Sequence, residues 1–329
     1  MTRANEAPIA PDMEELAEVF LIAGPTGAGK SAFALALAEA TGGEVVNADA
    51  LQVYRDLRIL SARPSPEDEA RAPHHLFGVV DGAASWSVGK WQAAAAQVLA
   101  DIAARGRPAI VVGGTGLYFR ALTTGLAAIP QVSPEIRAAT ARTFDLLGEA
   151  AFREQLREHD PAAAERIYAG DRQRLSRAWE VFEATGRALS DWQGATGPGP
   201  LGERGRAVAI EPTRDVLYAR CDARFEAMVT GGALAEVEAM VARGLGPAAP
   251  VMKAVGVREL AGHLSGELSL EQAVEQAQRE TRRYAKRQLT WLRRQTPDWP
   301  RVASEGADAW DQFSQALGLG GKSLRQSPP

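Results

Sequence analysis

The octapeptide at residues 24–31 constrains this chain more than any other feature, because it fits the pattern G-x-x-x-x-G-K-[ST] at every fixed position. An apolar run at 19–23 precedes it and an Ala/Leu-rich segment at 32–40 follows it, which predicts a strand before the loop and a helix after it. In that setting the loop N–H groups surround a phosphate, and the helix N-terminus adds partial positive charge. We therefore expect a di- or triphosphate to bind Gly24, Pro25, Thr26, Gly27, Ala28, Gly29, Lys30 and Ser31.

Two residues of this loop have specific chemical tasks. Lys30 neutralises phosphate oxygens, and the hydroxyl of Ser31 is the kind of ligand through which such loops hold a metal. We expect Mg²⁺ as the cofactor and Ser31 as its protein ligand. The loop alone leaves open which phosphate compound binds and whether a phosphoryl group is transferred.

Further along the chain, short apolar runs alternate with helical patterns. The runs 44–48, 109–112 and 207–210 are typical of buried strands, and 91–104 has the pattern of an amphipathic helix. This alternation predicts an α/β fold with a doubly wound parallel sheet as the P-loop core.

The pattern changes at about residue 131, after which only helical signals occur until the Gly/Pro-rich stretch at 194–200. The simplest arrangement is an all-helical domain inserted into the core. The expected parts are a disordered tail at 1–18, a discontinuous P-loop core at 19–130 and 201–312, an inserted helical domain at 131–200, and a disordered tail at 313–329.

Composition excludes several classes of protein. A single cysteine, Cys221, allows no disulfide framework, which favours a reducing cytoplasm. No stretch approaches the roughly 18 apolar residues of a membrane span, and no secretory signal opens the chain. The net charge of −4 argues weakly against a protein that simply coats nucleic acid. Without coiled-coil heptads, we expect a monomer.

Polar residues follow two of the predicted strands. Asp49 comes after the run 44–48, and Thr115 lies in the Gly-rich segment 113–116 after the run 109–112. Ligands of such sheets bind beyond the carboxyl ends of the strands. Asp49 is therefore either a Mg²⁺ ligand or a general base, with a helix cap or ion pair as the structural alternative. Thr115 can donate a hydrogen bond to a leaving oxygen, and its glycines permit close approach of a ligand; a capped tight turn is the alternative.

Taken together, these motifs resemble the tRNA dimethylallyltransferase (isopentenyl-tRNA transferase) family. The resemblance covers roughly residues 20–294 in the family's order and spacing. Its segments are GPTGAGKS, NADALQVY, PHHL, VGGTGLYF, QRLSRA, KAVGVREL and TRRYAKRQLTWLR.

The resemblance implies transfer of the dimethylallyl group of dimethylallyl diphosphate to N6 of adenosine 37, just 3′ of the anticodon in tRNA. The P-loop then binds a diphosphate leaving group and transfers no phosphoryl group. Asp49, Thr115 and Lys30 are the expected catalytic residues, with Asp49 taking the proton of the attacking amine. Arg220 and Arg224 both offer a further diphosphate contact, and the family pattern favours Arg224.

The implied partner is the tRNA anticodon stem-loop. By the same resemblance, 19–130 and 201–312 form the transferase core, and the insert at 131–200 is the tRNA-binding domain. The resemblance assigns tRNA contacts to Asp49, Ala50, Leu51, Gln52, Thr115, Arg137, Gln173, Arg174, Leu175, Ser176 and Arg177. Ala50 departs from the family, which usually has Ser there, so any role of that hydroxyl is in doubt.

A basic stripe at 279–294 adds Arg283, Lys286 and Arg287 to this set. It holds seven basic residues against one acidic residue, which in an acidic protein indicates contact with a phosphate backbone. A solvated face of an amphipathic core helix is the alternative.

Two other enzymes share parts of these signals: an isopentenyltransferase acting on free adenine nucleotides, and a P-loop small-molecule kinase. A nucleotide-switch RNA-binding protein without transferase activity is a third reading. The adjacent His74 and His75 face opposite ways on an extended segment, so we expect structural roles for them, and Cys221 is expected to be an inert helix residue.

Overall fold

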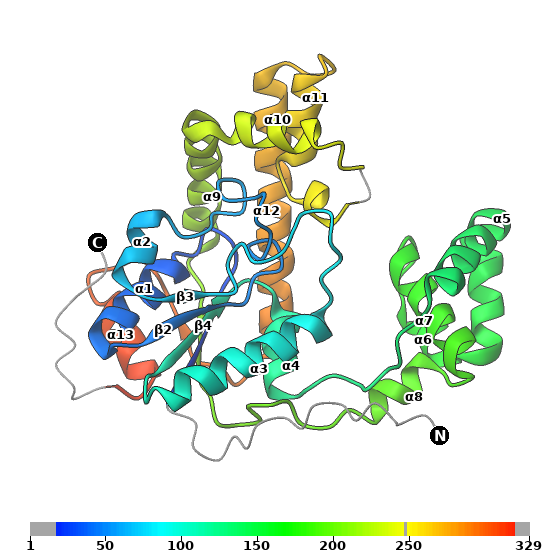
Figure 1. The fold of residues 1–329 in the computed structure, drawn as a ribbon, viewed down its shortest axis with the longest axis horizontal. Coiled ribbons are helices and arrows are strands. Elements are labelled where there is room, and N and C mark those ends of the chain that lie inside the picture. The colour runs from blue at the N-terminus through cyan, green and yellow to red at the C-terminus, as the bar shows by residue number, and fades with distance from the viewer. Residues whose placement is uncertain (1–17, 247–248, 320–329) are drawn as a thin grey trace, which may run out of the picture. The chain divides into compact units, whose positions relative to one another are not determined.

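The computed structural model describes residues 18–246 and 249–319 (Figure 1). The strands are β1 Val19–Ala23, β2 Glu44–Asn47, β3 His74–His75, β4 Ala109–Gly113, β5 Arg206–Ile210 and β6 Arg301–Val302. The helices before residue 200 are α1 Lys30–Thr41, α2 Pro66–Arg71, α3 Val88–Ala104, α4 Gly116–Thr123, α5 Pro134–His159, α6 Pro161–Arg166, α7 Arg172–Thr185 and α8 Leu189–Gly194. Those after it are α9 Arg214–Met228, the π-helix η2 Val229–Ala233, α10 Leu234–Ala242, the 3₁₀ helix η3 Pro250–Lys253, α11 Val257–Leu264, α12 Leu270–Gln295 and α13 Ala309–Ala316.

The described strands form one parallel sheet in the order β3-β2-β4-β1-β5-β6. β1 occupies a central position between β4 and β5, with Val19 paired to Ala109 and Phe20 to Arg206. Every residue of β1 and β4 is buried, as expected for parallel strands covered by helices on both faces. The predicted α/β fold with a parallel P-loop sheet is therefore confirmed.

Alternation along β1 assigns its side chains to two layers. Phe20 and Ile22 join the core formed with α1 and α13, where Phe33 packs on Phe313 at a ring distance of 4.8 Å. Leu21 points to the opposite face of the sheet. A second aromatic pair joins α3 to α4, where Trp91 stacks on Tyr118 at 4.0 Å.

Beyond the sheet, helices α9 to α12 form a second group that belongs to the same compact unit (Figure 1). The 26-residue α12 packs along α9 and α11. Its apolar side is buried through Ala273, Ala277, Ala285, Leu289 and Leu292, so the helix is held by core packing along most of its length.

The chain divides into two compact units, residues 1–123 with 200–329 and residues 124–199. The smaller unit contains only helices and has its own core, with Phe152, Leu156 and Val181 at its centre. Its first helix, α5, is two helices joined at Gly148, whose φ of 72° interrupts the helical geometry. The unit begins at 124, whereas the sequence placed the start of the insertion at 131.

The expected disordered tail at 313–329 is wrong for its first part. Phe313 is fully buried in α13, and Leu317 and Leu319 are also buried. All three belong to the hydrophobic core that includes α1. Residues 320–329 and 1–17 lie outside the described residues. Glu18, also assigned to a tail, forms an ion pair with Arg206 at 3.0 Å. Among the described residues, no helix is both long and apolar enough to cross a membrane.

Candidate active site

The loop at 24–31 has the backbone conformation that phosphate binding needs. It leaves the buried end of β1 and enters α1 at Lys30, as predicted. Gly27 and Gly29 have φ angles of 82° and 84°, which residues with a side chain rarely adopt. Gly24 is constrained differently, since a Cβ there would lie 2.9 Å from the carbonyl oxygen of Ile210.

Lys30 is buried at the start of α1, and its Nζ donates to the carbonyl oxygen of Pro25 at 3.3 Å. Burial lowers the pKa of Lys30 from 10.5 to about 8, and the nearby Asp49 carboxylate partly opposes this shift. An anion bound in the loop would further favour the charged form of the lysine.

Ser31 is exposed, and none of the described residues forms a hydrogen bond with its hydroxyl. A hydroxyl that is free at this position suits Mg²⁺, which prefers oxygen ligands and keeps several waters or phosphate oxygens of its own. The described residues contain no cluster of three acidic, His or Cys side chains that could hold a metal without such help.

Asp49 lies just beyond the carboxyl end of β2, where the sequence placed it. Its Oδ1 accepts the N–H of Leu51 at 2.9 Å. Its own N–H donates to Oδ1 of Asn47 at 2.7 Å. The carboxylate is thus fixed by a local turn and by a buried asparagine that the sequence analysis did not select.

Thr115 faces this turn from the loop after β4. Its Oγ1 accepts the N–H of Ala50 at 2.9 Å, so the hydroxyl proton remains available to a ligand oxygen. The neighbouring glycines serve a purpose that the sequence did not reveal, because they admit the protein's own chain. A Cβ at Gly113 would lie 2.1 Å from the carbonyl oxygen of Ala48, and one at Gly116 would lie 2.0 Å from the ring of Trp291.

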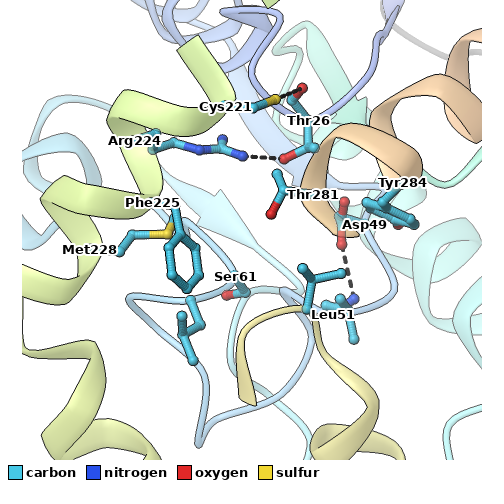
Figure 2. Close-up of a pocket in the computed structure, with 12 residues that line it drawn as sticks. Thr26, Asp49, Leu51, Ser61, Cys221, Arg224, Phe225, Met228, Thr281 and Tyr284 are labelled. Carbon is cyan, nitrogen blue, oxygen red and sulfur yellow. Dashed lines mark hydrogen bonds between the residues drawn. The ribbon is translucent and has the colours of Figure 1, made fainter. Parts of the chain in front are cut away.

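A pocket of roughly 500 Å³, including the solvent at its mouth, joins these elements. Figure 2 shows Thr26 and Arg224 at one part of it, with Asp49 beside Tyr284 and with Phe225 and Met228 on the other side. Its lining consists of Thr26, Asp49, Leu51, Leu60, Ser61, Cys221, Arg224, Phe225, Met228, Val255, Thr281 and Tyr284. The pocket therefore combines a phosphate-binding loop, a carboxylate and an apolar wall.

The two arginines that the sequence left as alternatives differ in their surroundings. Arg224 reaches from α9 into the pocket, where its Nη2 donates to the hydroxyl of Thr26 (Figure 2). Burial lowers the pKa of Arg224, and the nearby Asp49 carboxylate is among the groups that oppose this shift. Arg220 donates instead to Oγ of Ser304 at 2.6 Å and does not line the pocket.

Cys221, expected to be an inert helix residue, is buried against the P-loop. Its thiol donates to the carbonyl oxygen of Thr26 at 3.6 Å, and burial raises its pKa. A Cβ at Gly27 would lie 2.9 Å from its sulfur, so the cysteine packs closely against the loop and limits its position.

The two adjacent histidines have structural partners. His75 lies 2.6 Å from the Glu44 carboxylate, and His74 lies 2.8 Å from the carbonyl oxygen of Ala72. Both interactions lie at the edge strand β3.

Several residues of the site escaped the sequence analysis. Thr281, Tyr284, Gln288 and Trp291 lie on one face of α12, at the spacing i, i+3, i+7 and i+10. Burial and then the Asp49 carboxylate raise the pKa of Tyr284, which keeps its hydroxyl protonated. This periodicity was visible in the sequence, but the basic residues between these positions obscured it.

The basic stripe on α12 divides into two groups. Arg282 pairs with Asp222 at 2.5 Å and Arg293 with Glu211 at 2.5 Å, so both serve the fold. Lys286 and Arg287 are exposed. Arg283 is exposed too, and it pairs with Glu280 one turn away on the same helix. Exposed charges of this kind are accessible to a polyanion.

In the helical unit, Arg137, Gln173 and Arg174 are exposed, and Ser176 and Arg177 are half-buried. The predicted tRNA contact of Leu175 is wrong, because its side chain is fully buried in the core of the unit and cannot reach tRNA. In the other unit, Gln52 uses its amide nitrogen to hold the carbonyls of Ser61 and Ala62 at 2.9 and 2.8 Å.

The chain matches the family model described as IPP transferase over residues 52–295 and an isopentenyl transferase model over 17–73. It is 63% identical to a tRNA dimethylallyltransferase from Phenylobacterium zucineum (strain HLK1) over 303 residues, which cover 92% of this chain and 98% of that protein. The crystal structure of the full-length tRNA isopentenylpyrophosphate transferase from Bacillus halodurans is 30% identical, with a TM-score of 0.65 and coverage of 93% and 96%. A eukaryotic dimethylallyltransferase acting on tRNA shares the fold, with 24% identity, a TM-score of 0.78 and coverage of 95% and 82%.

The family match covers most of the chain and includes the P-loop, the Asp49 turn, the Thr115 loop and the pocket face of α12. On this evidence the chain belongs to the tRNA dimethylallyltransferase (IPP transferase) family.

Proposed function

We propose that the protein transfers the dimethylallyl group of dimethylallyl diphosphate to N6 of adenosine 37 in tRNA and releases diphosphate. The observation that carries this proposal is the pocket in which Thr26 of the P-loop, the Arg224 guanidinium and the Asp49 carboxylate face an apolar wall. A kinase pocket would need a second polar site for a phosphoryl acceptor rather than an apolar wall next to the phosphates.

Dimethylallyl diphosphate has a charged diphosphate and an apolar five-carbon group, and the pocket offers a matching region for each. Arg224 and Thr26 line one end of the pocket, and the P-loop that contains Thr26 also carries Lys30. The diphosphate meets this end, where Arg224, Lys30 and the loop provide positive charge and fixed donors. Leu60, Phe225, Met228 and Val255 are the apolar lining that receives the five-carbon group.

The acceptor amine needs help, since the lone pair of an adenine amino group is drawn into the ring. Asp49 lies in the pocket and takes the amine proton as the bond from N6 to the allylic carbon forms. At the same time the bond from that carbon to the diphosphate oxygen breaks, and both electrons leave with diphosphate. Thr115 donates its hydroxyl proton as a hydrogen bond to the leaving oxygen.

Mg²⁺ bound at the Ser31 hydroxyl would neutralise part of the diphosphate charge. The exposed hydroxyl and the neighbouring loop fit an ion of this kind.

For tRNA, we propose contacts at two sets of exposed residues. Lys286 and Arg287 on α12 and Gln173 and Arg174 on α7 offer charge or amide groups to the anticodon stem-loop. The target adenosine lies in a single-stranded loop, so it leaves its stack at lower cost than a paired base would.

The test is direct transfer of label. Purified protein is incubated with labelled dimethylallyl diphosphate, Mg²⁺ and unmodified tRNA carrying adenosine 37, with AMP and ATP as alternative acceptors. Label in tRNA, lost when adenosine 37 is replaced by guanosine, supports the proposal. Label in AMP or ATP instead would assign the protein to the free-nucleotide isopentenyltransferases, and phosphoryl transfer from ATP would assign it to the kinases.

A further inference from the structure

Gln288 connects the two loops that carry the site. Its Oε1 accepts the N–H of Thr26 in the P-loop at 2.8 Å, and its Nε2 donates to the carbonyl oxygen of Gly114 at 2.9 Å. The side chain is buried and projects from α12. The amide therefore adds a side-chain link between the loop after β1 and the loop after β4, which also meet through the N–H of Gly24 and the carbonyl oxygen of Gly113 at 3.3 Å.

The chain is shaped to admit this amide. A Cβ at Gly114 would lie 2.2 Å from Nε2 of Gln288, so only glycine leaves room for it. One turn further along α12, the ring of Trp291 fills the space beside Gly116 in the same way. Helix α12 thus packs on the loop after β4 through two side chains, Gln288 and Trp291, of which Gln288 makes the polar contact.

Each end of the amide lies one residue or one hydrogen bond away from the proposed chemistry. At the end near the binding site of dimethylallyl diphosphate, the hydroxyl of Thr26 accepts a hydrogen bond from the guanidinium of Arg224. At the end near the site of the acceptor adenosine, Thr115 follows Gly114 and accepts the N–H of Ala50, next to Asp49. Gln288 itself does not line the pocket. Its effect on the reaction must therefore pass through these neighbours.

We propose that Gln288 is a positioning residue that fixes the leaving-group loop relative to the loop bearing Thr115 and the Asp49 turn. The inference rests on the proposed function. Transfer between two substrates depends on the separation of the reacting atoms, and a displacement of about 1 Å can cost roughly 10²-fold in rate. The backbone hydrogen bond from Gly24 to Gly113 joins the two loops only at their bases. The amide holds Thr26 and Gly114 further along them, so its loss loosens the separation there.

Gln288→Leu, of similar volume, removes both hydrogen bonds. The matched control is Gln278→Leu, which removes a glutamine from the same helix that hydrogen-bonds α9 through Asp222 and Glu226 and is not part of the pocket. We expect kcat to fall about 10²-fold for Gln288→Leu, with the Kd for tRNA within twofold of wild type. Gln278→Leu should keep kcat within threefold.

Gln288→Glu supplies a readout that a merely structural role would not move. The ionised carboxylate still accepts the N–H of Thr26 but repels the carbonyl oxygen of Gly114, whereas the protonated acid can donate to it and restore both bonds. The rate of Gln288→Glu divided by that of wild type at the same pH should therefore rise as the pH is lowered from 8.5 to 5.5. Division by the wild-type rate removes the pH effects that both enzymes share.

A Gln288→Leu enzyme with near wild-type kcat would overturn the proposal. So would a Gln288→Glu ratio that is flat with pH, and this second variant decides the matter if Gln288→Leu does not fold. Failure of the proposed function would look different, because the wild-type enzyme itself would then place no label in tRNA.

Discussion

The carboxamide of Asn47 makes two hydrogen bonds with the backbone of Asp49, accepting its N–H at 2.7 Å and donating to its carbonyl oxygen at 3.0 Å. Its nitrogen also donates to the carbonyl oxygen of Leu76 at 3.0 Å. Asn47 is fully buried at the end of β2. The direction of the proposed base is therefore set by a residue that never touches the substrate.

Asn47→Ala should lower kcat about 10²-fold, because the turn that carries the Asp49 carboxylate loses its anchor. The KM for dimethylallyl diphosphate should change less than threefold, since the hydrogen bonds of Asn47 go to Asp49, Leu76 and Trp91 rather than to the P-loop. Steady-state kinetics with tRNA as the varied and then the fixed substrate measures both. An Asn47→Ala enzyme with unchanged kcat would show that the local turn alone fixes Asp49.

Asp49→Asn removes the basic oxygen but keeps the shape of the turn, since an amide oxygen still accepts the N–H of Leu51. We expect kcat to fall roughly 10²- to 10⁴-fold, the usual contribution of a general base. Binding of tRNA, measured by filter retention, should stay within threefold of wild type. Full activity of Asp49→Asn would remove the base from the mechanism and leave the P-loop assignment intact.

Arg224→Met and Arg220→Met form a matched pair one turn apart on α9. Arg224 lines the pocket and Arg220 is bonded to Ser304, so only the first change should reduce kcat/KM for dimethylallyl diphosphate. A loss of about 10²- to 10³-fold is expected, comparable to the removal of one fixed donor at a developing charge. The reverse ranking of the two variants would assign the diphosphate contact to Arg220.

The buried Lys30 predicts a pH dependence for donor binding. Its pKa in the free protein is about 8, against 10.5 when solvated, so the unfolded chain holds more protons between these values. The stability that Lys30 contributes to the free enzyme therefore rises with pH across this window. Donor binding needs the charged lysine, so the affinity for dimethylallyl diphosphate should fall as the pH rises above about 8.

Calorimetric titration of dimethylallyl diphosphate between pH 6.5 and 9.5 checks this expectation. The control is Lys30→Met, which should bind the donor much more weakly and show no bend near pH 8. A bend that survives in Lys30→Met would belong to the ligand or to another group.

Much of the fold was predictable because its signals are local. β1 and β4 are short apolar runs that each end in a Gly-rich loop, and the P-loop pattern identifies both the strand before it and the helix after it. Asp49 and Thr115 followed from the rule that ligands gather at the carboxyl ends of parallel strands. These inferences needed no knowledge of which strands are neighbours.

The parts that escaped prediction depend on contacts between distant segments. Gln288 lies 262 residues from Thr26, and nothing near it in the sequence announces a buried amide on a helix rich in arginine. The second half of α13 was placed in the disordered tail that the polar, Gly/Pro/Ser-bearing end of the chain predicted from 313 onward, although Trp310 and Phe313 have helical spacing. Leu175 was placed on the RNA because the family resemblance assigns the whole run 173–177 to tRNA contact, and only its burial shows that it belongs to the core.

Tyr168 supplies a last prediction, from the loop between α6 and α7. It is 75% exposed, although the backbone that carries it is firmly held. Arg153 donates to the carbonyl oxygens of Ala164, Ile167 and Tyr168 at 2.7, 2.6 and 3.1 Å. A fixed, outward-facing ring a few residues before the exposed Arg174 is suited to stack on an unpaired base of the anticodon loop.

Tyr168→Ala should weaken tRNA binding by roughly 5- to 150-fold, the range that corresponds to about 1–3 kcal/mol for loss of one stacked base, whereas Tyr168→Phe should bind as wild type does. Fluorescence titration with an anticodon stem-loop measures the Kd. Leu146→Ala is the matched control, because this residue of α5 is 85% exposed in the same unit but cannot stack on a base as an aromatic ring does. Equal effects of Tyr168→Ala and Leu146→Ala would mean that general surface area, rather than stacking, contributes to binding, and a Tyr168→Phe defect would shift the contact from the ring to the hydroxyl.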